Sequence, residues 1–380
     1  MLLSFYLHIV LLISFTIFSF VAVSFIQRIR TENNLSSLTP SASVHDAQIE
    51  LHSVANGTNK SPSNASVARI DESNLRENIF GSPKAKNPIL DRLTFINPPN
   101  TVCIYPNNME NYMIFIVLSR AFNFDFRQAI RGTWGRSEKY KGYNTTIKTI
   151  FFVGIDDSVQ SAVRHEQARF NDVIEIAIPE SYAFIAHKEL ASLLWTRLYC
   201  PLARILFRAD DDILMDTFLL LNFIKDDLNL NVKDGLYGWF RFNNTVHRGD
   251  RWAVTKMEYK PNTYPPYTFG VGYLFSNFSC QRLVNAANQP NHQIVRIGDA
   301  YITGILRDLA EIPFYDFKDL KFSYTFYNPI PCDEYFMNNP QLLLCMSKLH
   351  TGMRDDPLEF YDVWDAILTK YEKSLSDIFD

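Results

Sequence analysis

The chain has 380 residues, of which 47% are hydrophobic and 21% are charged, so it can bury enough surface for one large or two medium domains. A net charge of −4 and a pI near 6.1 argue against nucleic-acid binding, which normally needs a concentrated basic face. With 19 Tyr, 30 Phe and 5 Trp, the chain is too aromatic for a disordered or fibrous protein. These values indicate a globular protein.

The N-terminus predicts a membrane anchor. Residues 2–26 contain no Asp, Glu, Lys or Arg and are long enough to cross the hydrocarbon layer of a bilayer. A cleaved signal peptide is the alternative. However, the apolar block is longer than an ordinary h-region, lacks a charged n-region and does not end in a small-residue cleavage site. We therefore predict an uncleaved transmembrane signal anchor at 1–26.

Two observations disagree about the orientation of this anchor. Arg28 and Arg30 follow the span and nothing basic precedes it, so the positive-inside rule alone places the C-terminal side in the cytoplasm. Glycosylation sequons instead suit a chain made in the secretory lumen, and we give their density the greater weight. The candidate sites are Asn34, Asn56, Asn59, Asn64, Asn144, Asn243 and Asn277.

Residues 27–98 have the composition of a disordered stem. The stretch 33–74 is rich in Ser, Asn, Thr and Ala, has no aromatic residue and shows no sustained apolar period. Such a segment cannot bury enough surface to repay its ordering entropy. The composition changes at Pro98 and Pro99, so we expect the folded domain to span 99–380.

The folded part begins as alternating strands and helices. Continuous apolar runs predict buried strands at 112–119, 147–155, 173–178 and 203–209. Helices are predicted at 124–135, at 158–170 with Ser158 as its cap, and at 183–200. This alternation predicts a parallel α/β sheet with helices on both faces, and beyond residue 234 shorter aromatic strands predict a mixed second half.

The five cysteines do not form a metal motif. Cys103, Cys200, Cys280, Cys332 and Cys345 show neither a CxxC nor a metal-knuckle spacing, which argues against a zinc site. In an oxidising lumen one or two disulfides are expected, with one thiol left over. The spacing leaves the pairing open.

Three adjacent carboxylates, Asp210, Asp211 and Asp212, follow the predicted strand 203–209. A solvated turn is the ordinary interpretation of such a charge run. However, ligands of open α/β sheets bind at the carboxyl ends of strands, where three uncompensated anions are costly unless a cation neutralises them. Oxygen-only ligands favour Mg²⁺ or Mn²⁺, which commonly bind a substrate diphosphate as well. Asp216 is expected to cap the next helix.

Six segments carry a family resemblance. They are FRQAIRGTWG (126–135), FFVGIDD (151–157), HKELASLLWTRLYC (187–200), ILFRADDDI (205–213), YPPYTFGVGYLFS (264–276) and IGDAYITGIL (297–306). In sequence and order they resemble the β-1,3-glycosyltransferases of the galactosyl- and N-acetylglucosaminyltransferase type (glycosyltransferase family 31). The resemblance spans roughly 103–368, nearly the whole folded part.

The resemblance implies a fold, a reaction and a location. The fold would be an α/β domain of the GT-A type, a Rossmann-like nucleotide-diphospho-sugar transferase fold, behind the anchor and stem. The reaction would be an inverting transfer from a UDP-sugar to a glycan acceptor on a glycoprotein or glycolipid, with Mn²⁺ or Mg²⁺ as cofactor. The location would be the Golgi membrane, single-pass type II with a lumenal catalytic domain, which settles the orientation against the two arginines.

The family motif assigns roles around the carboxylate triplet. Asp212 matches the direct metal ligand, while Asp210 and Asp211 would contact the ribose and the metal shell. Arg131 matches an arginine near the nucleotide, and Arg127 lies on the same helix face, with a surface ion pair as its alternative. Lys188 matches a family lysine, although His-Lys-Glu replaces Leu-Lys-Thr, and an ordinary surface lysine is its alternative.

Two further residues complete the predicted site. Asp299 matches the family's general base in a Glu-Asp-Val segment, here Gly298-Asp299-Ala300, and an N-cap is its alternative. His350 is a candidate second metal ligand by resemblance. Aromatic residues that are candidates for a sugar platform, with core packing as their alternative, are Trp239, Trp252, Tyr264, Tyr267 and Tyr273.

Three functions are compatible with these features. A β-1,3-galactosyltransferase is preferred over a β-1,3-N-acetylglucosaminyltransferase. The third is an inactive glycan-binding relative, and the glycine at 298 in place of the family glutamate is its only support.

Overall fold

The computed structural model describes residues 76, 88–96, 103, 112–228, 232–290, 292–325, 331–346 and 357–373, all within the compact unit Val67–Asp380. The anchor at 1–26, most of the stem, the first four sequons and His350 lie outside the described residues, so they stay predictions. The predicted start of the folded domain at residue 99 is too late, because α3 (Pro88–Asp91) packs in the core and β1 (Phe95–Ile96) pairs with β5 (Val173–Pro179). No helix in the described part of the chain is long and apolar enough to span a membrane.

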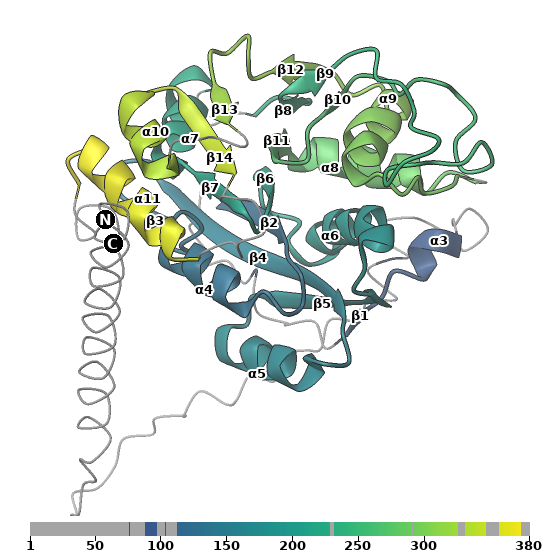
Figure 1. The fold of residues 1–380 in the computed structure, drawn as a ribbon, viewed down its shortest axis with the longest axis horizontal. Helices are drawn as coiled ribbons and strands as arrows, with labels where there is room; N and C mark the ends of the chain where they lie inside the picture. The colour runs from purple at the N-terminus through teal and green to yellow at the C-terminus, as the bar shows by residue number, and fades with distance from the viewer. Residues whose placement is uncertain are drawn as a thin grey trace, which may run out of the picture. The chain divides into compact units, whose positions relative to one another are not determined.

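The central sheet has nine strands in the order β1-β5-β4-β2-β6-β11-β8-β12, with β3 paired to β4 (Figure 1). Its four middle strands, β5, β4, β2 and β6, run parallel, and β11 joins β6 antiparallel. The strand bounds are β1 Phe95–Ile96, β2 Tyr112–Leu118, β3 Lys139–Tyr140, β4 Thr145–Ile155, β5 Val173–Pro179, β6 Ile205–Asp210, β8 Leu236–Gly238, β11 Gly272–Ser276 and β12 Phe314–Asp316. The α/β architecture and the mixed second half are therefore confirmed.

Helices cover both faces of this sheet, because its middle strands are apolar on both sides. On β2, Phe115 packs into one core and Ile114 into the other. The first core contains α4 Phe124–Gly132, α5 Gln160–Phe170, α7 Thr217–Asn222, α10 Cys332–Asn338 and α11 Leu358–Lys370. The second contains α3 Pro88–Asp91, α6 Ile185–Tyr199, α8 Asn277–Ala287 and η4 Ala300–Leu306.

Smaller elements complete the described chain. Strands β7 Ile213–Met215, β14 Leu342–Met346 and β13 Ser323–Thr325 form a second sheet, and β9 Phe240–Arg241 pairs with β10 Tyr267–Thr268. Short helical turns occur at η2 Tyr182–Phe184, η3 Phe223–Asp227 and α9 Arg307–Leu309.

The sequence pattern predicted the main strands and helices up to β6, but it misplaced the end of one helix and the start of another. The first helix ends at Gly132 and not at Gly135, whose N–H bonds to the carbonyl of Ile130 in a closing turn. The predicted cap Ser158 is wrong, because α5 begins after Val159 and the Ser158 hydroxyl bonds to Asp156. Asp216 is confirmed as the cap of α7, since it accepts the N–H of Leu219 at 2.9 Å.

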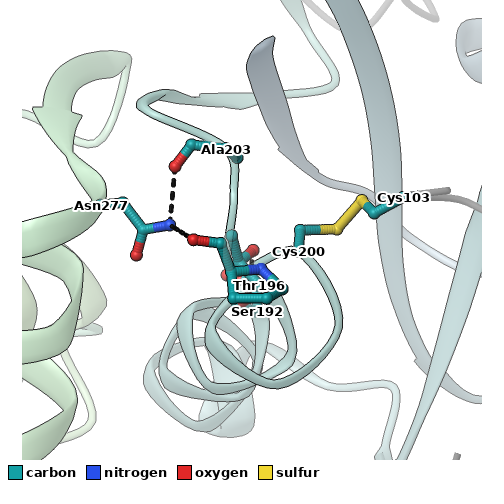
Figure 2. The surroundings of a disulfide bond; sticks show 7 residues. Cys103, Ser192, Thr196, Cys200, Ala203 and Asn277 are labelled. Carbon is teal, nitrogen blue, oxygen red and sulfur yellow. Dashed lines mark hydrogen bonds between the residues drawn. A yellow bond between two sulfur atoms is a disulfide. The ribbon is translucent and has the colours of Figure 1, made fainter. Parts of the chain in front are cut away.

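Two disulfides form, and the spacing alone had left their pairing open. Cys103 pairs with Cys200 across 97 residues and Cys332 pairs with Cys345 across 13, while Cys280 is a buried free thiol. The first disulfide follows the end of α6 (Figure 2).

The sequon at Asn277 is used for packing. Its amide nitrogen donates hydrogen bonds to the carbonyls of Ala203 at 2.6 Å and Pro201 at 3.0 Å, and the side chain is buried (Figure 2). Because a glycan would have to occupy that nitrogen, the prediction of a glycan on Asn277 is incompatible with this fold. Asn144 and Asn243 are exposed and stay candidate sites.

Candidate active site

The predicted site residues gather where β2 and β6 end. Leu118 at the end of β2 lies opposite Asp210 at the end of β6. The chain leaves β2 into α4 on one face of the sheet and reaches β6 from α6 on the other. A point where neighbouring parallel strands connect to opposite faces leaves a crevice at their carboxyl ends, the usual ligand site of such folds.

A cavity of about 530 Å³ occupies this crevice. It brings together five of the predicted residues, Lys188, Asp210, Asp211, Asp212 and Asp299. Its other lining residues are Leu118, Ser119, Arg120, Phe122, Asp156, Glu180, Ser181, Tyr182, Ile185, Arg208, Phe269, Gly270, Val271 and Met346.

Asp211, the middle carboxylate of the triplet, forms hydrogen bonds to the loop after β2. Oxygen Oδ2 of Asp211 accepts hydrogen bonds from the Ser119 hydroxyl at 2.6 Å, the Asn123 amide at 2.9 Å and the Arg120 N–H at 3.3 Å. Asp210 and Asp212, on either side, are half-buried on the cavity wall. The triplet is therefore a turn tied to the loop after β2, and its two outer carboxylates line the cavity.

Arg127 does not reach the cavity. Its fully buried guanidinium donates to Glu166, to the Ser119 hydroxyl at 2.9 Å and to the carbonyls of Arg120 and Ala121. The predicted nucleotide contact is therefore wrong for the side chain itself, and its alternative as a surface ion pair is also wrong. Arg127 supports the site indirectly, because Ser119 in turn holds the turn after β6.

Arg131 is likewise a structural residue. It makes two 2.7 Å hydrogen bonds to Asp172 and an ion pair of 2.8 Å with Glu166, and its guanidinium lies over the rings of Phe151 and Phe170. The helix periodicity placed both arginines on one face correctly, but that face looks toward α5 and the loop that follows it. The predicted contact between Arg131 and the nucleotide is therefore wrong in this structure.

Lys188 lines the cavity as predicted and is not a surface lysine. Its side chain is 3% exposed, and its ammonium donates to the Ser119 carbonyl at 2.8 Å and to Glu180 at 2.6 Å. Burial lowers the pKa of Lys188, and the charge of Glu180 opposes that change. Glu180 also accepts the N–H groups of Ala121 and Gly154, so this pair joins the loop after β2 to the wall formed by α6.

Asp299 is an N-cap, as its alternative stated, and it also faces the cavity. Its carboxylate accepts the N–H of Ala300 at 2.8 Å, which caps η4, and it also lines the cavity. Burial raises the pKa of Asp299 above its ordinary value, while the Ala300 N–H and the charge of Arg208 oppose the rise. A half-buried carboxylate of raised basicity on a cavity wall is suited to accept a proton.

The sequence reasoning missed Arg208 on β6. Its guanidinium lies 2.8 Å from Asp210 Oδ1 and 3.2 Å from Glu189 Oε1, and it donates to the Gly270 carbonyl. The available signal was an arginine inside the apolar run ILFRAD, a position where an unpaired charge is costly. Arg208 connects the acidic turn to the strand end beside Asp299.

Comparison with known proteins assigns the chain to a family. The family model described as Galactosyltransferase matches residues 125–318, which is just over half of the chain. This chain belongs to the galactosyltransferase family. The resemblance found in the six segments is thereby confirmed.

Several relatives in this galactosyltransferase family are 25–28% identical to the chain over the segments that align with it. A human lactosylceramide 1,3-N-acetyl-beta-D-glucosaminyltransferase is 28% identical over 53% of this chain and 55% of its own length. A UDP-GalNAc:beta-1,3-N-acetylgalactosaminyltransferase 1 from Mus musculus is 25% identical over 54% and 62%, and the beta-1,3-galactosyltransferase bre-2 from Caenorhabditis elegans is 27% identical over 53% and 58%. The chain thus spans somewhat over half the length of these relatives.

A solved structure also matches this galactosyltransferase-family chain. The apo structure of the bifunctional glycosyltransferase WbbM has a TM-score of 0.34 and 10% identity, covering 72% of this chain and 53% of that one.

None of the five aromatic candidates lines the cavity, Tyr267 included. Trp239, Tyr264 and Tyr273 are buried and pack in the core, as their alternative stated. Trp252 is partly exposed, but it does not line the cavity. Two aromatic residues that the sequence reasoning missed, Phe122 and Tyr182, line it instead and are 51% and 62% exposed.

The residues of this site that could hold a metal ion are the outer carboxylates of the triplet, Asp210 and Asp212. No group of three His, Cys, Asp or Glu side chains converges on one point among the described residues, which do not include His350. A hard divalent ion commonly takes only one or two protein carboxylates and completes its shell with substrate phosphate and water. Asp210 and Asp212 on the cavity wall fit that pattern.

Proposed function

We propose that this chain is an inverting, metal-dependent β-1,3-glycosyltransferase that transfers a hexose, preferably galactose, from a UDP-sugar to the 3-hydroxyl of an acceptor sugar. The observation that carries the proposal is that Asp299 and the Asp210–Asp212 turn face one cavity at the switch point of a parallel sheet. The names of the three relatives share a 1,3 transfer and differ in the sugar, so N-acetylglucosamine is the alternative donor sugar.

Asp212, with Asp210 beside it, would hold Mn²⁺ or Mg²⁺. The ion would supply positive charge where the leaving UDP gains negative charge. Asp211 keeps these two carboxylates in place through its bonds to the loop after β2. Arg208 holds one oxygen of Asp210 at 2.8 Å and so leaves the other for the ribose or the metal shell.

Asp299 would act as the general base. An inverting transfer needs a group that takes the proton of the acceptor hydroxyl as this attacks the anomeric carbon opposite the leaving UDP. Asp299 caps the start of η4, away from the turn after β6, and burial raises the pKa of its carboxylate. Phe122 and Tyr182 add exposed ring faces to the cavity, on which the apolar face of a sugar would stack.

The remaining parts of the proposal concern the fold family and the location. The parallel strands β5-β4-β2-β6 with a ligand cavity at their carboxyl ends support a GT-A assignment. The apolar stretch 2–26 and the sequons support a type II membrane protein with its catalytic domain in the Golgi lumen. The acceptor would be a glycan on a glycoprotein or glycolipid.

A transfer assay with the full-length chain tests the proposal. The purified protein is incubated with Mn²⁺, β-linked acceptors and UDP-galactose, UDP-N-acetylglucosamine or UDP-N-acetylgalactosamine. We expect Asp299→Asn to lower kcat about 100-fold or more, the usual effect of losing a general base, and the exposed Asp319→Asn to change it less than about twofold. Absence of transfer from every donor would refute the enzyme assignment, and a fully active Asp299→Asn would refute the base.

A further inference from the structure

Gly298, directly before the proposed base, borders a carboxyl group from another element. A Cβ atom at position 298 would lie 2.6 Å from Oε2 of Glu189, closer than real Cβ contacts, while the backbone of Ala186 lies 3.6 Å away. Gly298 is buried, and Glu189 stands on α6, 109 positions earlier in the chain. The space that a side chain at 298 would need is therefore filled by the Glu189 carboxyl.

Glu189 is an unusual residue to bury in this place. It is 0% exposed and does not line the cavity, yet its Oε1 accepts the Tyr273 hydroxyl at 3.0 Å and lies 3.2 Å from Arg208. Its Oε2, aimed at Gly298, accepts no hydrogen bond from the described residues. A buried carboxyl with one unsatisfied oxygen is costly, which points to a role other than stability.

That role follows from what Arg208 touches. The same guanidinium binds Glu189, Asp210 of the acidic turn and the carbonyl of Gly270, which lies next to Asp299. Tyr273 and Arg208 are direct cross-strand partners on β11 and β6, so Glu189 contacts both strands at once. Moving the Glu189 carboxyl would remove one of the three partners that hold Arg208 between the acidic turn and the segment beside Asp299.

We infer that Glu189 and Gly298 are a matched pair, in which the glycine makes room for a buried carboxyl that positions Arg208 between Asp210 and Asp299. The inference rests on the proposed transferase function and makes Glu189 a positioning residue for it. A carboxyl from α6 thus already occupies the space that a side chain at 298 would enter.

A mutant cycle on the full-length protein tests the pair without relying on activity. Gly298→Ala should lower Tm by about 4 °C or more in the wild-type background, because the new Cβ displaces the Glu189 carboxyl. In the Glu189→Ala background the same alanine should change Tm by less than about 1 °C, since the obstacle is gone. Equal shifts in both backgrounds would overturn the inference.

Transfer kinetics test the positioning role. Glu189→Ala should lower kcat about 10- to 100-fold with the donor KM within about twofold, and Glu189→Gln should retain more of kcat because it keeps the shape. An aspartate at 298 would place a carboxyl oxygen two bonds from its Cβ, close to the 2.6 Å that separates this Cβ position from Oε2 of Glu189. The double variant Glu189→Ala/Gly298→Asp should therefore have a kcat about tenfold higher than Glu189→Ala alone.

The outcomes separate the two claims. A wild type that transfers no sugar refutes the proposed function, and the Tm cycle still decides whether the residues are paired. An active wild type whose double variant is no better than Glu189→Ala overturns the positioning role of the carboxyl, whatever the Tm values.

Discussion

Replacing Arg131 with methionine separates a structural role from a nucleotide contact. Methionine keeps much of the side-chain length and its contact with Phe151 and Phe170, but it removes every hydrogen bond to Asp172 and Glu166. From the structure we expect Arg131→Met to lower the free energy of unfolding and to leave the affinity for nucleotide unchanged. A direct diphosphate contact would produce the opposite result.

The size of the defect follows from the partners left behind. Removing one member of a buried ion pair costs about 3–5 kcal/mol, because the remaining charge stays buried. Glu166 would still be paired with Arg127, and the Asp172 side chain is 15% exposed. We therefore expect the free energy of unfolding to fall by about 3 kcal/mol, the lower end of this range. For a folded unit of this size, that corresponds to a fall in Tm of about 6–12 °C.

The defect should also depend on pH. Burial already raises the pKa of Asp172, against the opposing effect of Arg131, so the pKa rises further when Arg131 is removed. A carboxyl whose pKa is higher in the folded state than in the unfolded state stabilises the fold at low pH and loses that contribution as pH rises. The difference in stability between variant and wild type should therefore be larger at pH 7.5 than at pH 5.

Thermal unfolding and calorimetric titration with UDP and Mn²⁺ measure the two properties. Arg169→Met, an exposed arginine on α5, is the matched control and should shift Tm by less than about 2 °C. Asp212→Asn, on the cavity wall, should weaken UDP binding about tenfold. An Arg131→Met protein with wild-type Tm and about tenfold weaker UDP binding would refute the structural assignment.

Four further results are expected. Cys280 should not react with a thiol reagent in the native protein at pH 8 but should react once after unfolding, because burial raises its pKa to about 12; labelling of the native protein would contradict this. The double variant Cys332→Ser/Cys345→Ser should have a free energy of unfolding about 3 kcal/mol lower in denaturant titration, because the disulfide closes a short loop. An unchanged denaturation midpoint would refute this prediction. Asp216→Ala removes the cap of α7 and the partner of Lys370 at 2.9 Å and should cost about 2 kcal/mol by the same measurement. EDTA should abolish transfer and Mn²⁺ should restore it, whereas full activity in EDTA would contradict metal dependence.

The sequence alone determined the strand–helix order from 112 to 210 and the location of the site. Continuous apolar runs and amphipathic repeats are local signals, and the parallel sheet they predict has only one ligand edge. Asp210, Asp211 and Asp212 lie at that edge for this reason, whereas Lys188 and Asp299, which also line the cavity, were predicted from the family resemblance.

Only the tertiary structure decided where the other charges point. Helix periodicity places Arg127 and Arg131 on one face, but it cannot say that Glu166 and Asp172 meet them there from α5 and its loop. In the same way, no residue near Gly298 in the sequence indicates that Glu189 packs against it from α6. Whether a charged side chain binds a ligand or another side chain depends on which distant segment packs against it, and that is a property of the folded chain alone.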